Sequence, residues 1–127
     1  MTDTWVFLIR ERDWDSDAYL PEALAARGAQ ADLDEDMAAH GRFAQAVEEL
    51  GAQMLGGHAL QNRKYGGTVT PGSDGADAVW SDAPLPDSSE VITGFYTVAC
   101  DEDTARKLAT MVPSAGVVEM RKVHPFE

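Results

Sequence analysis

Basic residues are scarce in this sequence. It has 10 Lys and Arg against 22 Asp and Glu, which gives a formal net charge of −12. Nucleic acids and anionic lipids bind proteins through Lys and Arg, because these side chains displace condensed counterions. The densest basic clusters are the pairs Arg63-Lys64 and Arg121-Lys122. We therefore expect no nucleic-acid partner.

Cysteine and long apolar runs are also lacking. A single cysteine, Cys100, excludes an internal disulfide framework and any zinc site built on paired thiolates. It lies in an apolar run, which favours a small buried side chain over a nucleophile. The apolar run Trp5–Ile9 is too short for a signal peptide, and no stretch approaches the ~20 apolar residues of a membrane span. These absences predict a soluble, cytoplasmic protein that does not associate with membranes.

The length and composition are those of one globular domain. The chain has 127 residues, of which 44% are hydrophobic and 25% charged. This length matches a single core and is too short for two. No internal repeat divides the sequence, so residues 1–127 are expected to form one domain.

Two segments, Thr4–Arg10 and Glu90–Cys100, are apolar at both alternating sets of positions, which is typical of strands covered on both faces. A third segment contains the pair Gly56-Gly57, which indicates a bulge or a close approach to the backbone. The expected strands are Thr4–Arg10, Met54–Leu60, Thr68–Thr70, Ala78–Trp80, Glu90–Cys100 and Val117–Val123.

Helices are expected between these strands. Pro21–Arg27 has proline at its start and is followed by glycine, which favours a short helix. A long helix is predicted to start at Asp32 or Asp34 as the N-cap and to end at Gly51. Its apolar stripe is expected to include Met37, His40, Phe43, Ala44, Val47 and Leu50. Asp101 is expected to cap a further helix that is buried along Ala105, Leu108, Ala109 and Val112 and stopped by Pro113.

The order of these elements predicts an α+β domain with an antiparallel sheet. The two main helices can cover only one face of the sheet. The strands Thr4–Arg10 and Glu90–Cys100 are nevertheless apolar on both faces, so the second face needs a cover. A second copy of the same sheet is the simplest cover, and the sequence therefore predicts a homodimer.

Five segments together resemble the YCII-related family, in the branch marked by the motif Asp-Gly-Pro-Phe. The marker segment here is Asp82-Ala83-Pro84-Leu85, which keeps the Asp and the Pro and changes the second and fourth positions. The resemblance covers nearly the whole chain apart from a longer acidic segment, Asp13–Asp32. The matching segments are the opening aromatic strand, Met54–Leu60, Ser81–Leu85, Gly94–Tyr96 and Val118–Arg121.

The resemblance implies a ferredoxin-like fold of the dimeric α/β-barrel type, with an antiparallel sheet, two helices on one face and a second copy closing a shared interior. It also implies two classes of function. The first is an enzyme of the lyase or isomerase kind, acting on a small organic molecule with a His–Asp pair in a pocket between sheet and helix. The second is a non-catalytic ligand-binding or regulatory module of the kind encoded beside alternative sigma factors. An accessible pocket in which a carboxylate reaches the histidine would favour the enzyme.

The resemblance points to His40 and Asp82 as the catalytic pair. His40 is a polar residue on an apolar helix face, and a carboxylate partner would fix its tautomer and raise its pKa above ~6.5. Burial without such a partner would lower the pKa instead. The alternatives are a hydrogen-bonded core histidine and an aspartate that binds turn backbone.

Four further residues are candidate ligand contacts: Trp5, Phe43, His58 and Phe95. Aromatic residues in strands are more often core residues than ligand contacts. His58, with His40 and Asp82, would complete a nominal two-His, one-carboxylate metal set, but their spacing is not a local ligand motif. We therefore predict neither a metal nor a cofactor.

Overall fold

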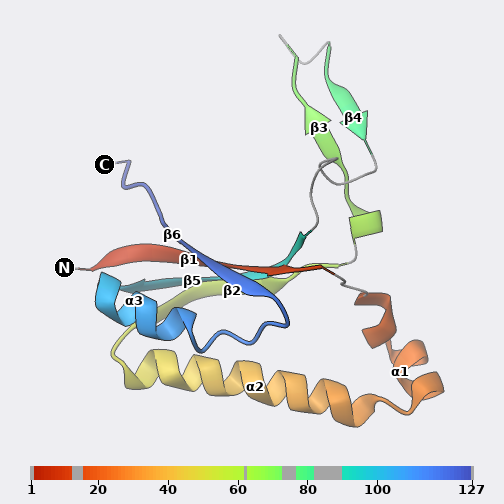
Figure 1. Ribbon diagram of the computed structural model, residues 1–127, viewed down its shortest axis with the longest axis horizontal. Coiled ribbons are helices and arrows are strands. Elements are labelled where there is room, and N and C mark those ends of the chain that lie inside the picture. The colour runs from red at the N-terminus through yellow and green to blue at the C-terminus, as the bar shows by residue number, and fades with distance from the viewer. Residues whose placement is uncertain (1, 13–15, 62, 73–76, 82–89, 127) are drawn as a thin grey trace.

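A four-stranded antiparallel sheet with helices on one face forms the body of the protein in the computed structural model (Figure 1). Residues 2–12, 16–61, 63–72, 77–81 and 90–126 are described. Asp82 and the predicted marker segment therefore lie outside the described residues. In chain order the elements are β1 (Asp3–Glu11), η1 (Ser16–Tyr19), α1 (Pro21–Arg27), α2 (Gln30–Glu49), β2 (Gln53–Ala59), η2 (Arg63–Tyr65), β3 (Thr68–Thr70), β4 (Val79–Ser81), β5 (Val91–Cys100), α3 (Glu102–Ala109) and β6 (Val117–Lys122).

The strand order of the sheet is β2-β5-β1-β6, and every neighbouring pair is antiparallel. β1 and β5 occupy the centre, in agreement with their apolar residues on both faces. This order and the β-α-β connections at each end of the chain are compatible with a ferredoxin-like fold. The predicted α+β class and antiparallel sheet are confirmed. The predicted short helix α1 is present in addition to the two main helices.

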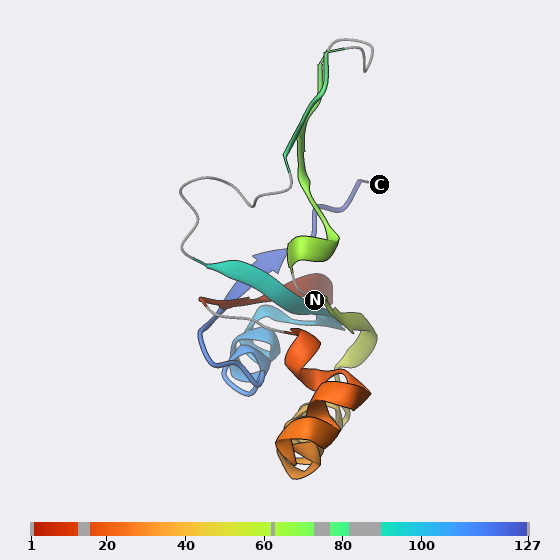
Figure 2. The ribbon, with the colours of Figure 1, turned by 90° about the vertical axis from the view of Figure 1, so that its right-hand side faces the viewer.

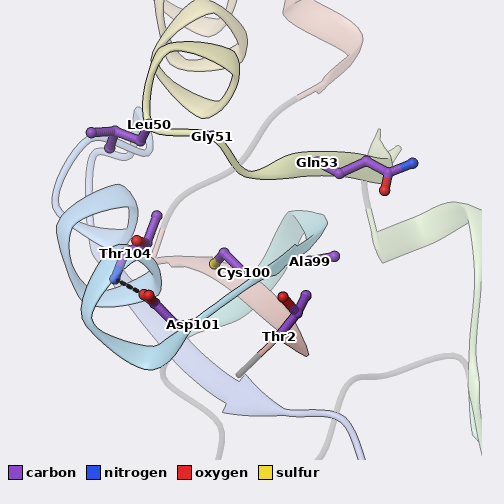
Figure 3. A pocket seen from close by; sticks show the side chains of 8 residues that line it. All are labelled: Thr2, Leu50, Gly51, Gln53, Ala99, Cys100, Asp101 and Thr104. Carbon is purple, nitrogen blue, oxygen red and sulfur yellow. Dashed lines mark hydrogen bonds between the residues drawn. The ribbon is translucent and has the colours of Figure 1, made fainter.

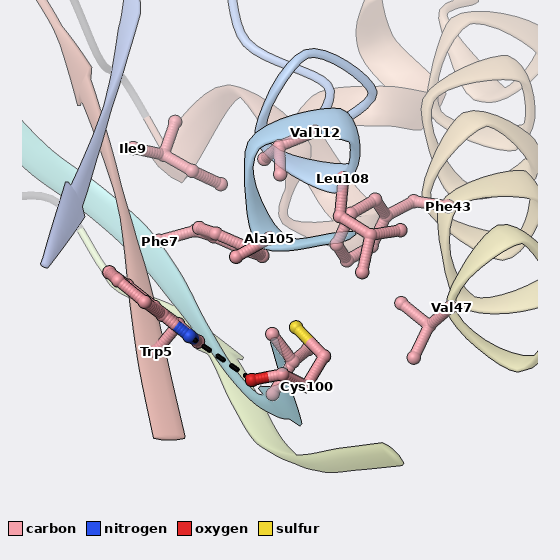
Figure 4. Packing of buried hydrophobic residues seen from close by; sticks show 10 residues of the cluster. Trp5, Phe7, Ile9, Phe43, Val47, Cys100, Ala105, Leu108 and Val112 are labelled. Carbon is pink, nitrogen blue, oxygen red and sulfur yellow. Dashed lines mark hydrogen bonds between the residues drawn. The ribbon is translucent and has the colours of Figure 1, made fainter. Parts of the chain in front are cut away.

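The core lies between the sheet and the helices α2 and α3 (Figure 4). Alternate residues of β1, namely Trp5, Phe7 and Ile9, point toward the helices and are buried. α3 contributes Ala105 and Leu108, which are fully buried. The predicted cap is present, because the Asp101 carboxylate accepts a hydrogen bond from the Thr104 amide at 2.8 Å.

The predicted start and stripe of α2 need correction. The helix begins at Gln30 with Ala29 as its N-cap, so neither predicted aspartate caps it. Ala29 is buried and its carbonyl accepts the amides of Asp32 and Leu33, so packing sets this end rather than a side-chain cap. Phe43 and Val47 are buried as predicted, whereas the stripe members Met37, Ala44 and Leu50 are exposed. The N-terminal half of α2 extends beyond α3, which leaves part of the predicted stripe without a partner helix (Figure 1).

The face of the four-stranded sheet opposite the helices, here called the open face, has no cover among the described residues (Figure 2). Strand alternation and register place Val6 and Leu8 of β1 on it, with Phe95 of β5 directly opposite Leu8. An ion pair crosses the same face from Arg10 to Glu119 of β6 at 2.9 Å. The structure therefore confirms that the helices cover one face of the sheet only, and no other described element covers the second, partly apolar face.

The strands β3 and β4 form a separate two-stranded ribbon that projects away from the sheet (Figures 1 and 2). Val69 and Trp80 pair across it, and Trp80 is 73% exposed. The ribbon confirms the two short strands predicted at Thr68–Thr70 and Ala78–Trp80, with β4 shifted one residue toward the C-terminus. Across the described residues, no helix is both long and apolar enough to cross a membrane.

Candidate functional site

His40 lies on α2, one helical turn before the buried Phe43 and on the same side of the helix. Its ring is partly buried between the helix and the sheet. The helix-facing residue of β5 at this level is Tyr96, whose hydroxyl lies 2.5 Å from Nδ1 of His40. The two ring centroids are 5.8 Å apart. The structure thus gives His40 a phenol as its hydrogen-bond partner.

The Tyr96 ring is held from two sides. Phe43 packs against it with a centroid distance of 4.7 Å. On the neighbouring strand, a Cβ atom at Gly57 would lie 2.6 Å from Cδ1 of Tyr96, so only glycine fits beside the ring. This confirms the close approach predicted from the Gly56-Gly57 pair. The predicted bulge is also present, as a register shift between Met54 and Gly56.

The environment of His40 favours its neutral form. Burial is the largest influence and lowers the pKa of His40, while the negative charges of Asp36 and Glu11 oppose that change. Burial also raises the pKa of the Tyr96 hydroxyl, which therefore keeps its proton. Near pH 7 the pair consists of a neutral imidazole and a neutral phenol. This is the outcome expected where burial outweighs the neighbouring carboxylates.

Two of the predicted ligand contacts belong to the hydrophobic core. Trp5 is 5% exposed, and its Nε1 donates to the Cys100 carbonyl at 3.3 Å. Phe43 is 1% exposed and lies edge-on to Phe7 at a centroid distance of 6.3 Å. Phe43 can still influence a ligand at His40 indirectly, because it packs against Tyr96.

The other two predicted contacts lie on the open face. His58 of β2 is directly opposite Phe95 of β5, and their ring centroids are 5.7 Å apart in an edge arrangement. The sheet therefore separates His58 from His40, which is on the helix side. Within the described ranges, no group of three or more His, Cys, Asp or Glu residues could hold a metal ion. The predicted residues thus divide into a helix-side group and an open-face group.

A hollow of about 340 Å³ lies at the end of the sheet where β5 leads into α3 (Figure 3). Its lining includes Cys100 and Asp101 but not His40. Burial, and to a smaller degree the charge of Asp101, raises the pKa of the Cys100 thiol, so this thiol is a poor nucleophile. The lining residues are Thr2, Leu50, Gly51, Gln53, Ala99, Cys100, Asp101 and Thr104.

The partnership of His40 with Tyr96 was not predicted from the sequence. A partial signal was present: Tyr96 shares its strand face with the apolar Val98 and Cys100, so its hydroxyl needs a partner across the core. Gly57 opposite Tyr96 was a second signal, because a strand glycine often leaves space for a neighbouring group.

No protein-family model matches the chain, and no curated protein is similar to it. Membership of the YCII-related family therefore remains a prediction.

Proposed function

We propose that the protein binds a small organic molecule beside His40 and transfers a proton on it, as lyases and isomerases do. The observation that carries this proposal is a neutral, partly buried histidine whose Nδ1 is bound at 2.5 Å while its other nitrogen is unpaired within the described residues. A neutral imidazole near pH 7 is suited to general acid–base catalysis.

In this proposal Asp82 is the second catalytic group. Its role is supported by the resemblance to the marker motif. A carboxylate can remove a proton from the ligand and return it at another position, while a neutral imidazole stabilises the developing charge as a hydrogen-bond donor. The proton count is unchanged over a complete cycle, which fits an isomerisation or an elimination. The single thiol, Cys100, suits a reducing compartment, and we place the protein in the cytoplasm.

Titration of His40 followed by NMR tests the role of Asp82. Asp82→Asn is expected to lower the pKa of His40 by about 1 pH unit, because the imidazolium loses a neighbouring opposite charge. Asp77→Asn is a matched control that removes the same charge from the exposed ribbon. An unchanged His40 titration in the Asp82 variant, or an equal change in both variants, would disprove the pair.

We further propose that two copies join through their open faces as a dimeric α/β barrel. Supporting this, Val6, Leu8 and Phe95 place apolar surface on a sheet face that no described element covers. Apolar sheet faces of this kind usually mark an interface. The open-face residues His58 and Phe95 would then lie inside the shared interior.

A second candidate function is that of a non-catalytic, regulatory module of the sigma-factor-associated type. The packing of Phe43 against Tyr96 favours it, because these side chains occupy the space between His40 and the core. A protein of this kind would bind ligands without converting them. If small molecules from a test panel bind to the protein but none of them is converted into a product, this alternative is correct.

A further inference from the structure

The hydrogen bond between His40 and Tyr96 has a direction. A neutral imidazole and a phenol carry one polar hydrogen each, so either Nδ1–H donates to the hydroxyl oxygen or the hydroxyl donates to Nδ1. Donor–acceptor distances are about 2.7–3.2 Å when N–H donates to oxygen and about 2.5–3.0 Å when a hydroxyl donates to oxygen. The 2.5 Å between Nδ1 and the Tyr96 oxygen lies at the short end, where hydroxyl donors are found. An imidazole nitrogen is also a stronger acceptor than a phenol oxygen, which favours the same direction.

The position of the Tyr96 hydroxyl is set by packing. Its ring lies between Phe43 and the bare backbone at Gly57, and a methyl group at Gly57 would collide with it. The ring therefore has little freedom to turn away from His40. With the hydroxyl as the donor, the Nδ1 atom stays occupied as an acceptor, and the imidazole proton is carried by Nε2.

The Nε2 atom is accessible. No described residue forms a hydrogen bond with it, and it is not among the buried side-chain atoms that lack a partner. Solvent or a ligand can therefore reach it. The nearby charges that influence the ring, from Asp36 on α2 and Glu11 on β1, are both negative. They disfavour an anionic group at this position.

We propose that Tyr96 is a positioning residue that holds His40 as the Nε2–H tautomer, so that His40 meets its ligand as a hydrogen-bond donor and the matching ligand atom is a neutral carbonyl oxygen. This inference rests on the proposed function, in which His40 is the group that faces the ligand. A neutral donor at a carbonyl stabilises the negative charge that develops on the oxygen when a neighbouring proton is removed. His40 is then the hydrogen-bond donor of the reaction and keeps its Nε2 proton, and the base is a different group.

Long-range ¹H–¹⁵N NMR of the ¹⁵N-histidine-labelled protein at pH 8 tests the tautomer without any ligand. We expect a protonated Nε2 and an unprotonated Nδ1 that is shifted by hydrogen bonding. Tyr96→Phe should move the Nδ1 resonance toward that of a free imine nitrogen, whereas Tyr65→Phe, at an exposed tyrosine, should not. A protonated Nδ1 in the wild type, or an Nδ1 resonance that Tyr96→Phe leaves in place, would overturn the proposal.

A second pair of variants separates this effect from loss of the fold. Gly57→Ala keeps the Tyr96 hydroxyl but displaces its ring, so it should move the His40 Nδ1 resonance as Tyr96→Phe does. Gly56→Ala is the matched control, because a Cβ at Gly56 meets nothing within 4 Å. If both glycine variants give the wild-type Nδ1 resonance, Tyr96 is not held by Gly57 and the positioning argument fails.

The ligand class is tested with acetophenone and with ethylbenzene, which has a similar shape but no oxygen. Acetophenone at millimolar concentration should shift the His40 Nε2 resonance in the wild type, and ethylbenzene should not. Equal shifts from both probes would overturn the carbonyl assignment. If the wild type shows the expected tautomer but acetophenone causes no shift, ligand binding at His40 is refuted and the Tyr96 assignment stands. The two proposals can therefore fail separately.

Discussion

Phe43→Ala is expected to lower the free energy of unfolding by about 3–5 kcal/mol. The Phe43 side chain is 1% exposed and bridges two layers of the core. It lies edge-on to Phe7 of β1 and packs against Tyr96 of β5. Truncation removes buried apolar surface and leaves a cavity between α2 and the sheet, which cannot close without moving the helix.

Met37→Ala on the same helix is the matched control. Met37 is 62% exposed, and Met and Ala have similar helix propensities, so the change should stay within about 0.5 kcal/mol. Urea unfolding followed by far-UV circular dichroism measures both variants. Similar losses of unfolding free energy in the two variants would mean that α2 packs on the sheet differently from the structure. The contact of Phe43 with Tyr96 would then also be in error.

Leu8→Glu is expected to convert a dimer into a monomer. Light scattering on a sizing column should give the wild type twice the chain mass of 13.7 kDa and the variant the chain mass itself. In the proposed barrel, Leu8 faces the partner sheet beside Phe95, and a carboxylate buried there without a partner costs several kcal/mol. A cost of about 3 kcal/mol already weakens dimerisation about a hundredfold, because every 1.4 kcal/mol changes the Kd tenfold.

The control for this variant is Leu20→Glu, which adds the same charge at an exposed leucine just before α1. It should leave the mass at the wild-type value. Circular dichroism and urea unfolding of the Leu8 variant show whether the monomer remains folded. A wild-type protein that runs as a monomer at micromolar concentration would remove the barrel proposal.

Local signals in the sequence predicted the elements well. Asp101 precedes two acidic residues, and a carboxylate at that position can reach the amide three residues later wherever the helix packs. The start of α2 was predicted wrongly because it depends on the burial of Ala29, a tertiary effect that the cap candidates Asp32 and Asp34 do not reveal. Hydrogen bonds between residues close in sequence, such as helix caps, can be predicted from the sequence. Tertiary packing that moves a helix end cannot be predicted in the same way.

The candidate site was harder to predict for the same reason. Alternation along β2 and β5 shows that His58 and Phe95 can share a face, but it does not show that the helices cover the opposite one. The bond from Tyr96 to His40 joins residues 56 positions apart and depends on how α2 lies over the sheet. For Asp82 the resemblance remains the only guide.

The central position of β1 affects how the protein is made. Its Trp5 bonds to a residue 95 positions later in β5, and its Arg10 pairs with a residue 109 positions later in β6. At a synthesis rate of about 5–20 residues per second, β1 emerges from the ribosome roughly 5–20 s before either neighbouring strand exists. An apolar strand that waits this long is a natural substrate for chaperones, and pairing at such long range predicts slow folding on the millisecond-to-second scale.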